Sequence, residues 1–257
     1  MNTPPHIILI TGLPGSGKSA ASDVIIQSLI KQRRTVVFRT DKQALEEEVR
    51  RDTLRFQSNP SRKLPKEGIE GDHSHLLNPD GADGSLQMVF KDGNALNTAH
   101  KQLLLEMLQF LVQKKEGDVF VIEWAYGKNV DYPGEALTHD GSQLITWLKE
   151  YGLIDQVLVL DIVSNEETRV ERNSKRPGHI PTGEFSMYFP EEGHFTPDDK
   201  SVLEDRYLLI DNLGISRETY TQFIEQIRFA TESFILPSLE ETQTHSKEWL
   251  FIHYKER

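Results

Sequence analysis

The stretch Gly12-Leu13-Pro14-Gly15-Ser16-Gly17-Lys18-Ser19 decides the fold, because it fits the pattern G-x-x-x-x-G-K-[ST] at every fixed position. The apolar run Ile7–Ile10 precedes it, and a helical pattern beginning at Ala20 follows it. A glycine-rich turn without a ligand is the alternative interpretation. The strand–loop–helix order argues against that alternative, because it brings backbone N–H groups and a helix N-terminus to face an anion. The stretch therefore predicts a site for a nucleoside triphosphate.

Seven of the eight residues of this stretch are expected to bind ATP or Mg²⁺. We expect Lys18 to supply a cation for the β- and γ-phosphates and to face a solvated loop rather than the core. The Ser19 hydroxyl is placed to ligate Mg²⁺. The residues expected to bind the nucleotide are Gly12, Pro14, Gly15, Ser16, Gly17, Lys18 and Ser19.

Length and composition exclude several classes of protein. The 257 residues suffice for one large α/β domain, 1–257, with insertions. No apolar run approaches the roughly 18 residues that span a bilayer, and the first residues lack the basic region of a signal peptide. The absence of cysteine excludes disulfides, thiolate catalysis and zinc–sulfur sites. We expect a cytoplasmic protein without a membrane partner, and the sequence does not determine its oligomeric state.

Charge is unevenly distributed around a net value of −11. Residues 31–66 contain eleven Lys and Arg against five Asp and Glu. The excess of acidic over basic residues lies in residues 67–257. The basic stretch predicts an anion-binding face on a protein that otherwise repels polyanions, with an ordinary solvated surface as the alternative. Arg51 and Arg55 share one helical face there and are the candidate substrate-binding residues.

Short β-rich runs alternate with helical patterns along the chain, which predicts a parallel sheet with helices on both faces. The expected strands are Ile7–Ile10, Thr35–Phe38, Val119–Ile122, Val157–Leu160 and Tyr207–Ile210. The expected helices include Lys42–Arg51, Ala95–Lys115, Ser142–Glu150, Glu166–Lys175 and one that begins after Ser216.

Two long stretches, 57–94 and 177–204, interrupt this alternation and are rich in Pro, Gly, Asp and Asn. We interpret the first as an acceptor-side loop and the second as a lid, because long loops within a compact domain are commonly functional. The run Trp249–Tyr254 fits an edge strand or the end of a tail helix.

Two acids follow predicted strands at the edge where the loop also opens. Asp41 follows the second strand and is a candidate general base, with capping of the next helix as the alternative. Glu123 closes the third strand and is a candidate catalytic residue and magnesium ligand, with an isolated acid at a strand end as the alternative.

Arg169, Arg172 and Arg176 recur on one helical face before the second long loop. Arg172 and Arg176 are candidate catalytic cations for the γ-phosphate, and pairing with neighbouring glutamates is the alternative. The run Asp72-His73-Ser74-His75 has metal-binding residue types but lacks further ligands at a convincing spacing, so we interpret it as a solvated loop.

These features together resemble the P-loop kinases of the polynucleotide-kinase and small-molecule-kinase type. The resemblance rests on the phosphate loop, on Arg39-Thr40-Asp41, on the run from Asp161 to Arg176 and on Asp211-Asn212-Leu213-Gly214. It implies a doubly wound five-stranded parallel sheet in the order 2-3-1-4-5. It also implies that Asp41 activates an acceptor hydroxyl, that Arg172 and Arg176 are lid arginines, and that Asn212 lies near the adenine.

The resemblance leaves the acceptor open. Lys42 follows Asp41, whereas many polynucleotide-type members have a second acid and an arginine nearby. The first hypothesis is transfer of the γ-phosphoryl group of ATP to a nucleoside, a nucleotide or a similar anionic or nucleotide-like small molecule. The second is a kinase acting on nucleic acid, and the third is an ATPase or ATP-binding module. A GTPase is not expected, because the sequence has no Asn/Thr-Lys-x-Asp motif.

Overall fold

Five parallel strands form the central sheet in the spatial order β10-β9-β1-β6-β2. Their bounds are β1 Ile7–Gly12, β2 Thr35–Thr40, β6 Asp118–Ala125, β9 Val157–Val163 and β10 Tyr207–Asp211. Numbered along the chain, this is the order 2-3-1-4-5, so the predicted α/β fold is confirmed. The computed structural model describes residues 5–58, 69–77, 87–115, 117–125, 127–132, 135–139, 141–175, 195–214 and 216–236.

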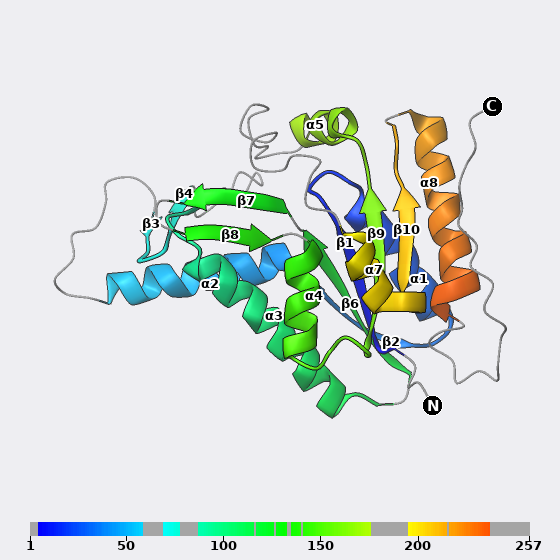
Figure 1. Ribbon diagram of the computed structural model, residues 1–257, viewed down its shortest axis with the longest axis horizontal. Coiled ribbons are helices and arrows are strands. Elements are labelled where there is room, and N and C mark those ends of the chain that lie inside the picture. The colour runs from blue at the N-terminus through cyan, green and yellow to red at the C-terminus, as the bar shows by residue number, and fades with distance from the viewer. Residues whose placement is uncertain are drawn as a thin grey trace.

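Both faces of the sheet are buried at its three central strands, β1, β6 and β9, where apolar side chains alternate between the two faces. Ile7 and Leu9 of β1 belong to one core cluster, and Ile8 and Ile10 belong to the other. Helices α3, α4 and α7 cover the first face, and α1 and α8 cover the second (Figure 1). Their bounds are α1 Lys18–Lys31, α3 Asn94–Gln113, α4 Gly141–Glu150, α7 Pro197–Leu203 and α8 Arg217–Ala230.

Helix α2 spans Asp41–Gln57 and begins directly where β2 ends. Its N-cap is Thr40, whose hydroxyl accepts a hydrogen bond from the Gln43 N–H, while the Gln43 side chain accepts one from the Thr40 N–H. The interpretation of Asp41 as the helix cap is therefore wrong. Thr40 has the extended backbone that a cap requires, and Asp41 is already within the first turn.

The stretch 57–94 contains regular structure that the sequence analysis did not predict. Strands β3 Ile69–Glu70, β4 Ser74–Leu77 and β5 Gln87–Phe90 form a small antiparallel sheet. This sheet packs on α2 through β3 and β4. Strands this short, set among turn residues, give too few alternating positions for the sequence pattern to reveal them.

Further elements lie beside the central sheet. They are the antiparallel hairpin of β7 Gly127–Tyr132 and β8 Glu135–His139, helix α5 Glu166–Ser174, the 3₁₀ turn η1 Glu204–Arg206 and the π-helical turn η2 Thr231–Ile235. Within the described part of the chain, no helix is both long and apolar enough to cross a membrane. The run Trp249–Tyr254, and the part of the predicted lid before Phe195, lie outside the described residues.

Candidate functional site

The phosphate loop connects β1 to α1 as predicted. A turn at Pro14 and Gly15 is closed by a hydrogen bond of 3.1 Å from the Ser16 N–H to the Leu13 carbonyl. Gly17 is the N-cap of α1 and has a φ of 110°, and an added Cβ there would lie 2.4 Å from Asn212 Nδ2. Only glycine combines this backbone conformation with so close a neighbour. The loop therefore brings the N-terminus of α1 to the carboxyl edge of the sheet.

Lys18 turns into the loop. Its ammonium donates hydrogen bonds to the carbonyl oxygens of Gly12 at 2.8 Å and Leu13 at 3.2 Å, and only 9% of the residue is exposed. The expectation that Lys18 faces a solvated loop is wrong in this respect, because carbonyl oxygens of the loop itself are close enough to accept from the ammonium. The cation nevertheless lies within the loop that is predicted to bind the phosphates.

Glu123 and Ser19 are brought together, as the sequence analysis expected. The Ser19 hydroxyl donates to Glu123 Oε2 at 3.0 Å, and the Ser22 hydroxyl donates to Oε1 at 2.5 Å. Glu123 lies near the end of β6 and is paired in register with Ile10 and Thr40 on the flanking strands. Ser22 was missed by the sequence analysis, although its position three residues after Ser19 places it on the same face of α1.

One carboxylate and one hydroxyl fit Mg²⁺, which commonly takes one or two protein oxygens and completes its shell with water and phosphate. No group of three or more His, Asp or Glu that could hold a metal ion occurs among the described residues. The described residues thus offer no complete protein cage for a metal, and Ser19 and Glu123 would hold the ion together with the nucleotide.

We expect Glu123→Gln to raise the Mg²⁺ concentration for half-maximal turnover by roughly 10- to 100-fold, the usual effect of weakening a metal's protein contacts. Glutamine keeps the shape and can still hydrogen-bond both hydroxyls, so the fold should be unchanged. Titration of ATP turnover with Mg²⁺ measures the effect, and Ser22→Ala is the matched control with a smaller shift. An unchanged titration for Glu123→Gln would remove Glu123 from the metal site.

Asp41 is buried beside the loop. Its Oδ2 accepts a hydrogen bond of 2.6 Å from the Ala125 N–H, and its Oδ1 accepts one of 2.7 Å from the Lys42 N–H. Burial is the main cause that raises the pKa of Asp41, and the negative charge of Glu123 adds to it. The positive charge of Lys18 and the two N–H groups oppose the rise. A carboxylate with a raised pKa next to a cation suits a general base.

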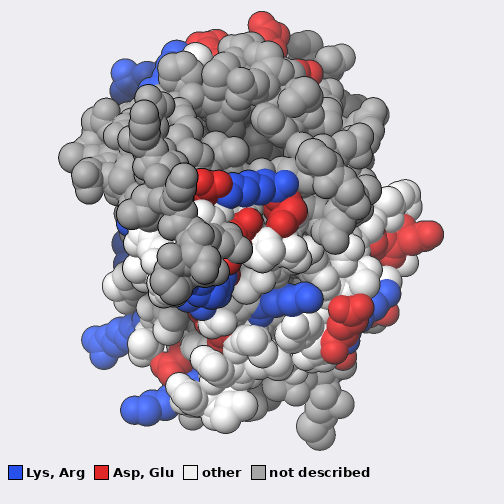
Figure 2. Space-filling view, turned by 90° about the vertical axis from the view of Figure 1, so that its left-hand side faces the viewer, with Lys and Arg blue, Asp and Glu red and all other residues white. Residues whose placement is uncertain are grey.

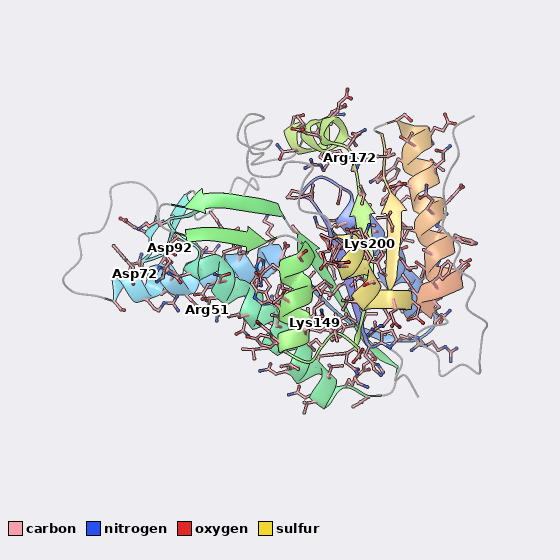
Figure 3. All side chains as sticks on the ribbon, viewed as in Figure 1. Arg51, Asp72, Asp92, Lys149, Arg172 and Lys200 are labelled. Carbon is pink, nitrogen blue, oxygen red and sulfur yellow. The ribbon has the colours of Figure 1, made fainter. Side chains whose placement is uncertain are left out.

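Arg172 and Asn212 donate hydrogen bonds to backbone carbonyls of the phosphate loop. The Arg172 guanidinium donates to the carbonyl oxygens of Gly15 and Ser16, each at 3.2 Å, and to Asn212 Oδ1 at 2.9 Å. Asn212 is buried, and its Nδ2 donates to the Ser16 carbonyl at 2.6 Å. Figure 3 places Arg172 at the carboxyl edge of the sheet, below α5. Arg176 lies outside the described residues.

A pocket of about 340 Å³ adjoins this side of the loop. It lies between the end of α5 and the start of α8, and it is lined by Arg172, Lys175, Gly214, Ser216, Arg217 and Tyr220. Its volume and its mixture of an aromatic ring and polar groups fit a nucleobase. Asn212 accepts a hydrogen bond from Arg172 of this lining, and its place near the adenine stays a prediction.

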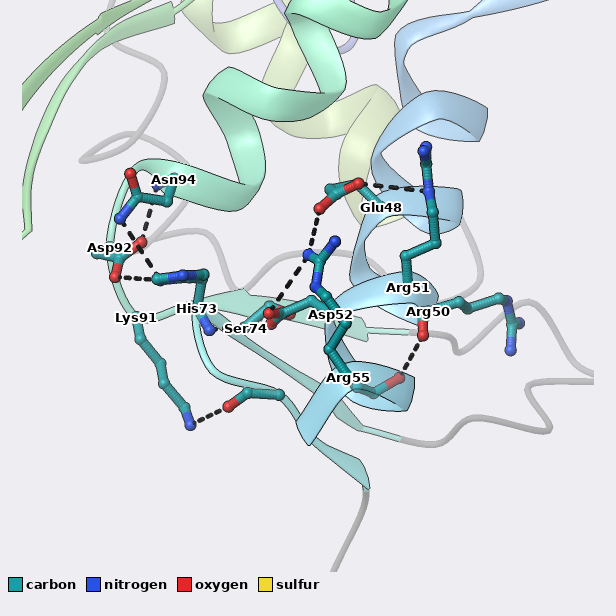
Figure 4. Close-up of polar contacts among 12 residues, drawn as sticks. Glu48, Arg50, Arg51, Asp52, Arg55, His73, Ser74, Lys91, Asp92 and Asn94 are labelled. Carbon is teal, nitrogen blue, oxygen red and sulfur yellow. Dashed lines mark hydrogen bonds and ion pairs between the residues drawn. The ribbon is translucent and has the colours of Figure 1, made fainter. Parts of the chain in front are cut away.

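Arg51 and Arg55 lie on α2 (Figure 4), and Figure 3 shows Arg51 far from Arg172. Both pair with Glu48, whose side chain is only 2% exposed; Arg55 Nη2 lies 2.6 Å from Oε1 and Arg51 Nε lies 3.3 Å from Oε2. Arg39 likewise binds Glu47 and Glu106. These three arginines of the basic stretch are therefore paired with acidic side chains. Figure 2 shows basic and acidic side chains beside one another at several places on this face.

The run Asp72-His73-Ser74-His75 comprises the turn between β3 and β4 and the first two residues of β4, which packs on α2. Asp52 accepts hydrogen bonds from the His73 N–H at 2.9 Å and from the Ser74 hydroxyl at 2.7 Å, and His73 Nδ1 lies 2.8 Å from Asp92 Oδ2 (Figure 4). These contacts connect α2 to the turn and to the start of α3. His73 therefore has a structural role and not that of a metal ligand. The turn is held by hydrogen bonds to Asp52 and Asp92, which distinguishes it from the solvated loop that was expected.

No protein-family model and no curated protein sequence matches this chain. Solved structures do: TT1252 from Thermus thermophilus shares 18% identity over 92% of this chain and 98% of its own, with a TM-score of 0.44. A sugar kinase from Janibacter sp. HTCC2649 shares 13% over 93% and 100% (TM-score 0.48), and shikimate kinase from Acinetobacter baumannii shares 11% over 89% and 94% (TM-score 0.41). Similarities this distant do not identify the substrate of this chain.

Proposed function

We propose that this protein is an ATP-dependent phosphotransferase that moves the γ-phosphoryl group to a hydroxyl or phosphate of a nucleoside, a nucleotide or a related small molecule. The observation that carries the proposal is the meeting of Lys18, Ser19, Glu123 and Asp41 at one edge of the sheet. A loop that binds triphosphate would suffice for an ATP-binding module. A buried carboxylate beside it adds a group that can take a proton from an acceptor.

The residues divide the chemistry among them. Backbone N–H groups of the loop and the N-terminus of α1 stabilise the negative charge of the phosphates, and Lys18 exchanges its loop carbonyl oxygens for phosphate oxygens. Mg²⁺, held by Ser19 and Glu123, would neutralise charge as the phosphoryl group moves. Asp41 Oδ accepts the proton of the acceptor hydroxyl as that oxygen attacks the γ-phosphorus and the bond to the leaving ADP oxygen breaks.

A nucleic-acid acceptor is the second candidate, and the arginines on α2 are the observation in its favour. Arg51 and Arg55 lie on one face of the helix that begins at Asp41, as a polymer crossing the site would require. The acidic partners of Arg51 and Arg55 weaken this argument, because a phosphate would have to displace Glu48. We therefore rank a small anionic acceptor first.

A screen with γ-labelled ATP tests the proposal. Nucleosides, nucleotides, small hydroxylated metabolites and modified and unmodified DNA are each incubated with the protein and Mg²⁺, and the products are separated. We expect label in one class of small acceptor. Label in DNA would favour the second candidate, and label in inorganic phosphate alone would leave an ATPase.

Arg51→Ala and Arg55→Ala are expected to raise the KM for the acceptor and to leave the KM for ATP nearly unchanged, if these arginines hold acceptor phosphates. Both substitutions also leave Glu48 with fewer partners, which costs about 1–3 kcal/mol of stability for a buried carboxylate. Urea denaturation measures that second effect separately. Arg50→Ala is the matched control, because Arg50 lies on the same helix and no ion pair from it is found among the described residues. Unchanged acceptor KM for both variants would reduce the basic stretch to a solvated surface.

A further inference from the structure

The Arg172 guanidinium donates hydrogen bonds to four acceptors of the protein itself. In addition to Gly15, Ser16 and Asn212, its Nη2 donates to the Gly214 carbonyl at 2.6 Å. One planar guanidinium thus connects the loop to the segment between β10 and α8. Four acceptors on two segments are a set that the rigid fork of arginine satisfies and a lysine ammonium does not.

The backbone of α5 presses on the loop at the same place. A Cβ added to Gly15, whose φ is 83°, would lie 2.9 Å from the Arg169 carbonyl oxygen and 3.1 Å from its Cα. Arg169 itself is fully buried. The contact between Gly15 and Arg169 fixes the distance between α5 and the loop, and this places the next turn of α5, with Arg172, within reach of the loop carbonyls.

The direction of these bonds matters for the phosphates. In a trans peptide the C=O of one residue and the N–H of the next point in opposite directions. Arg172 and Asn212 both donate to the Ser16 carbonyl, so the Gly17 N–H points away from these two side chains. Gly17 is the N-cap of α1, and a phosphate bound at that helix N-terminus would face its N–H group. The contacts of Arg172 and Asn212 thereby fix the direction of the Gly17 N–H.

Arg172 also lines the pocket of about 340 Å³ that we assign to the base. Gly214, which accepts one of its hydrogen bonds, lines the same pocket. A ligand in the pocket therefore contacts the residue that holds the loop. A ligand that orders Arg172 from the pocket would also order the Gly15 and Ser16 carbonyls, because Arg172 donates hydrogen bonds to both.

We propose that Arg172 is a positioning residue that holds the phosphate loop in its binding geometry and connects it to the base pocket. This inference rests on the proposed function for the identity of the ligands. It replaces the lid role that the resemblance implied for Arg172.

Two kinds of measurement test the inference. The first is binding of Mg²⁺-tripolyphosphate, which carries phosphates and no base, compared with Mg²⁺-ATP, both by calorimetry. We expect Arg172→Ala to weaken both ligands by about tenfold or more, as the loss of charge-assisted hydrogen bonds predicts. Arg217→Ala, in the same pocket, should weaken ATP alone, and Arg228→Ala on the exposed side of α8 should change neither.

The second measurement is the amide spectrum of protein labelled with ¹⁵N-glycine, recorded without any ligand. Arg172→Ala should shift the Gly15 and Gly17 amides, with Gly117 and Gly152, which have open space around them, as internal references. A residue that only contacted phosphate would not move these signals in the free protein. Saturating adenosine should shift the same two amides in the wild type and not in Arg172→Ala.

Arg172→Lys keeps the charge and the stem without the fork, and it should behave as Arg172→Ala does. It also serves if the alanine variant fails to fold. Loop amides that stay in place, together with unchanged tripolyphosphate affinity in either variant, would overturn the inference. A wild-type protein that bound neither ligand would overturn the proposed function instead, and the glycine amides of the free protein would still decide the role of Arg172.

Discussion

Replacement of Lys18 by alanine is expected to abolish triphosphate binding at concentrations that saturate the wild type. Charge-assisted contacts to phosphate contribute about 1.5–3 kcal/mol each, and Lys18 is expected to make more than one, so affinity should fall by roughly a hundredfold or more. The fold should persist, since the variant loses only hydrogen bonds to the carbonyls of Gly12 and Leu13, which water can replace. Calorimetry with Mg²⁺-ATP measures the loss.

Lys31→Ala is the matched control, because Lys31 is an exposed lysine in the last turn of the same helix. It should bind Mg²⁺-ATP as the wild type does. Full ATP affinity in Lys18→Ala, with the circular dichroism spectrum unchanged, would contradict the assignment of the phosphate loop.

The second large effect is expected for Asp41→Asn, which should lower phosphoryl transfer by about 10²–10⁴-fold and leave the KM for ATP nearly unchanged. The amide cannot take a proton from the acceptor. Its single oxygen can accept from only one of the N–H groups of Lys42 and Ala125, so stability should also fall, and urea denaturation separates the two effects. Steady-state kinetics with ATP and the acceptor measures the loss of transfer.

Thr40→Ala provides the control for Asp41. It removes the cap of α2, which costs about 1 kcal/mol of stability, and keeps the carboxylate. A folded Asp41→Asn with near-normal turnover would restrict Asp41 to its hydrogen bonds with the backbone.

The pH dependence gives an independent test of the same residue. Because the pKa of Asp41 is raised, chiefly by burial, the ionised base is lost as the pH falls through a value above the usual range of aspartate. The acidic limb of kcat/KM should therefore lie above that range in the wild type and disappear in Asp41→Asn.

The parts of the site that depend on the ends of buried strands could be predicted from the sequence. The loop is a contiguous pattern, and parallel strands buried on both faces appear as continuous apolar runs. Because such strands end at one edge, Asp41 and Glu123 had to meet the loop even though 81 residues lie between them.

The contacts that depend on how an element is placed over its neighbour could not be predicted. The spacing of Arg169 and Arg172 gave a shared helical face, but only the approach of α5 to Gly15 shows that Arg172 reaches the loop carbonyls. The ion pairs of Arg51 and Arg55, in contrast, could have been predicted from the sequence. Glu48 and Asp52 lie three or seven residues away from these arginines on the same helix, a spacing that brings side chains together. The sequence analysis considered only the excess of positive charge in this stretch.

The most direct test of the account follows the γ-phosphoryl group itself. Wild type and Asp41→Asn are incubated side by side with γ-labelled ATP, Mg²⁺ and the acceptor found in the screen, and label is counted in the acceptor and in inorganic phosphate. The account predicts that wild type labels the acceptor and that Asp41→Asn binds ATP with little transfer. Label released only as inorganic phosphate, equally by both proteins, would contradict it.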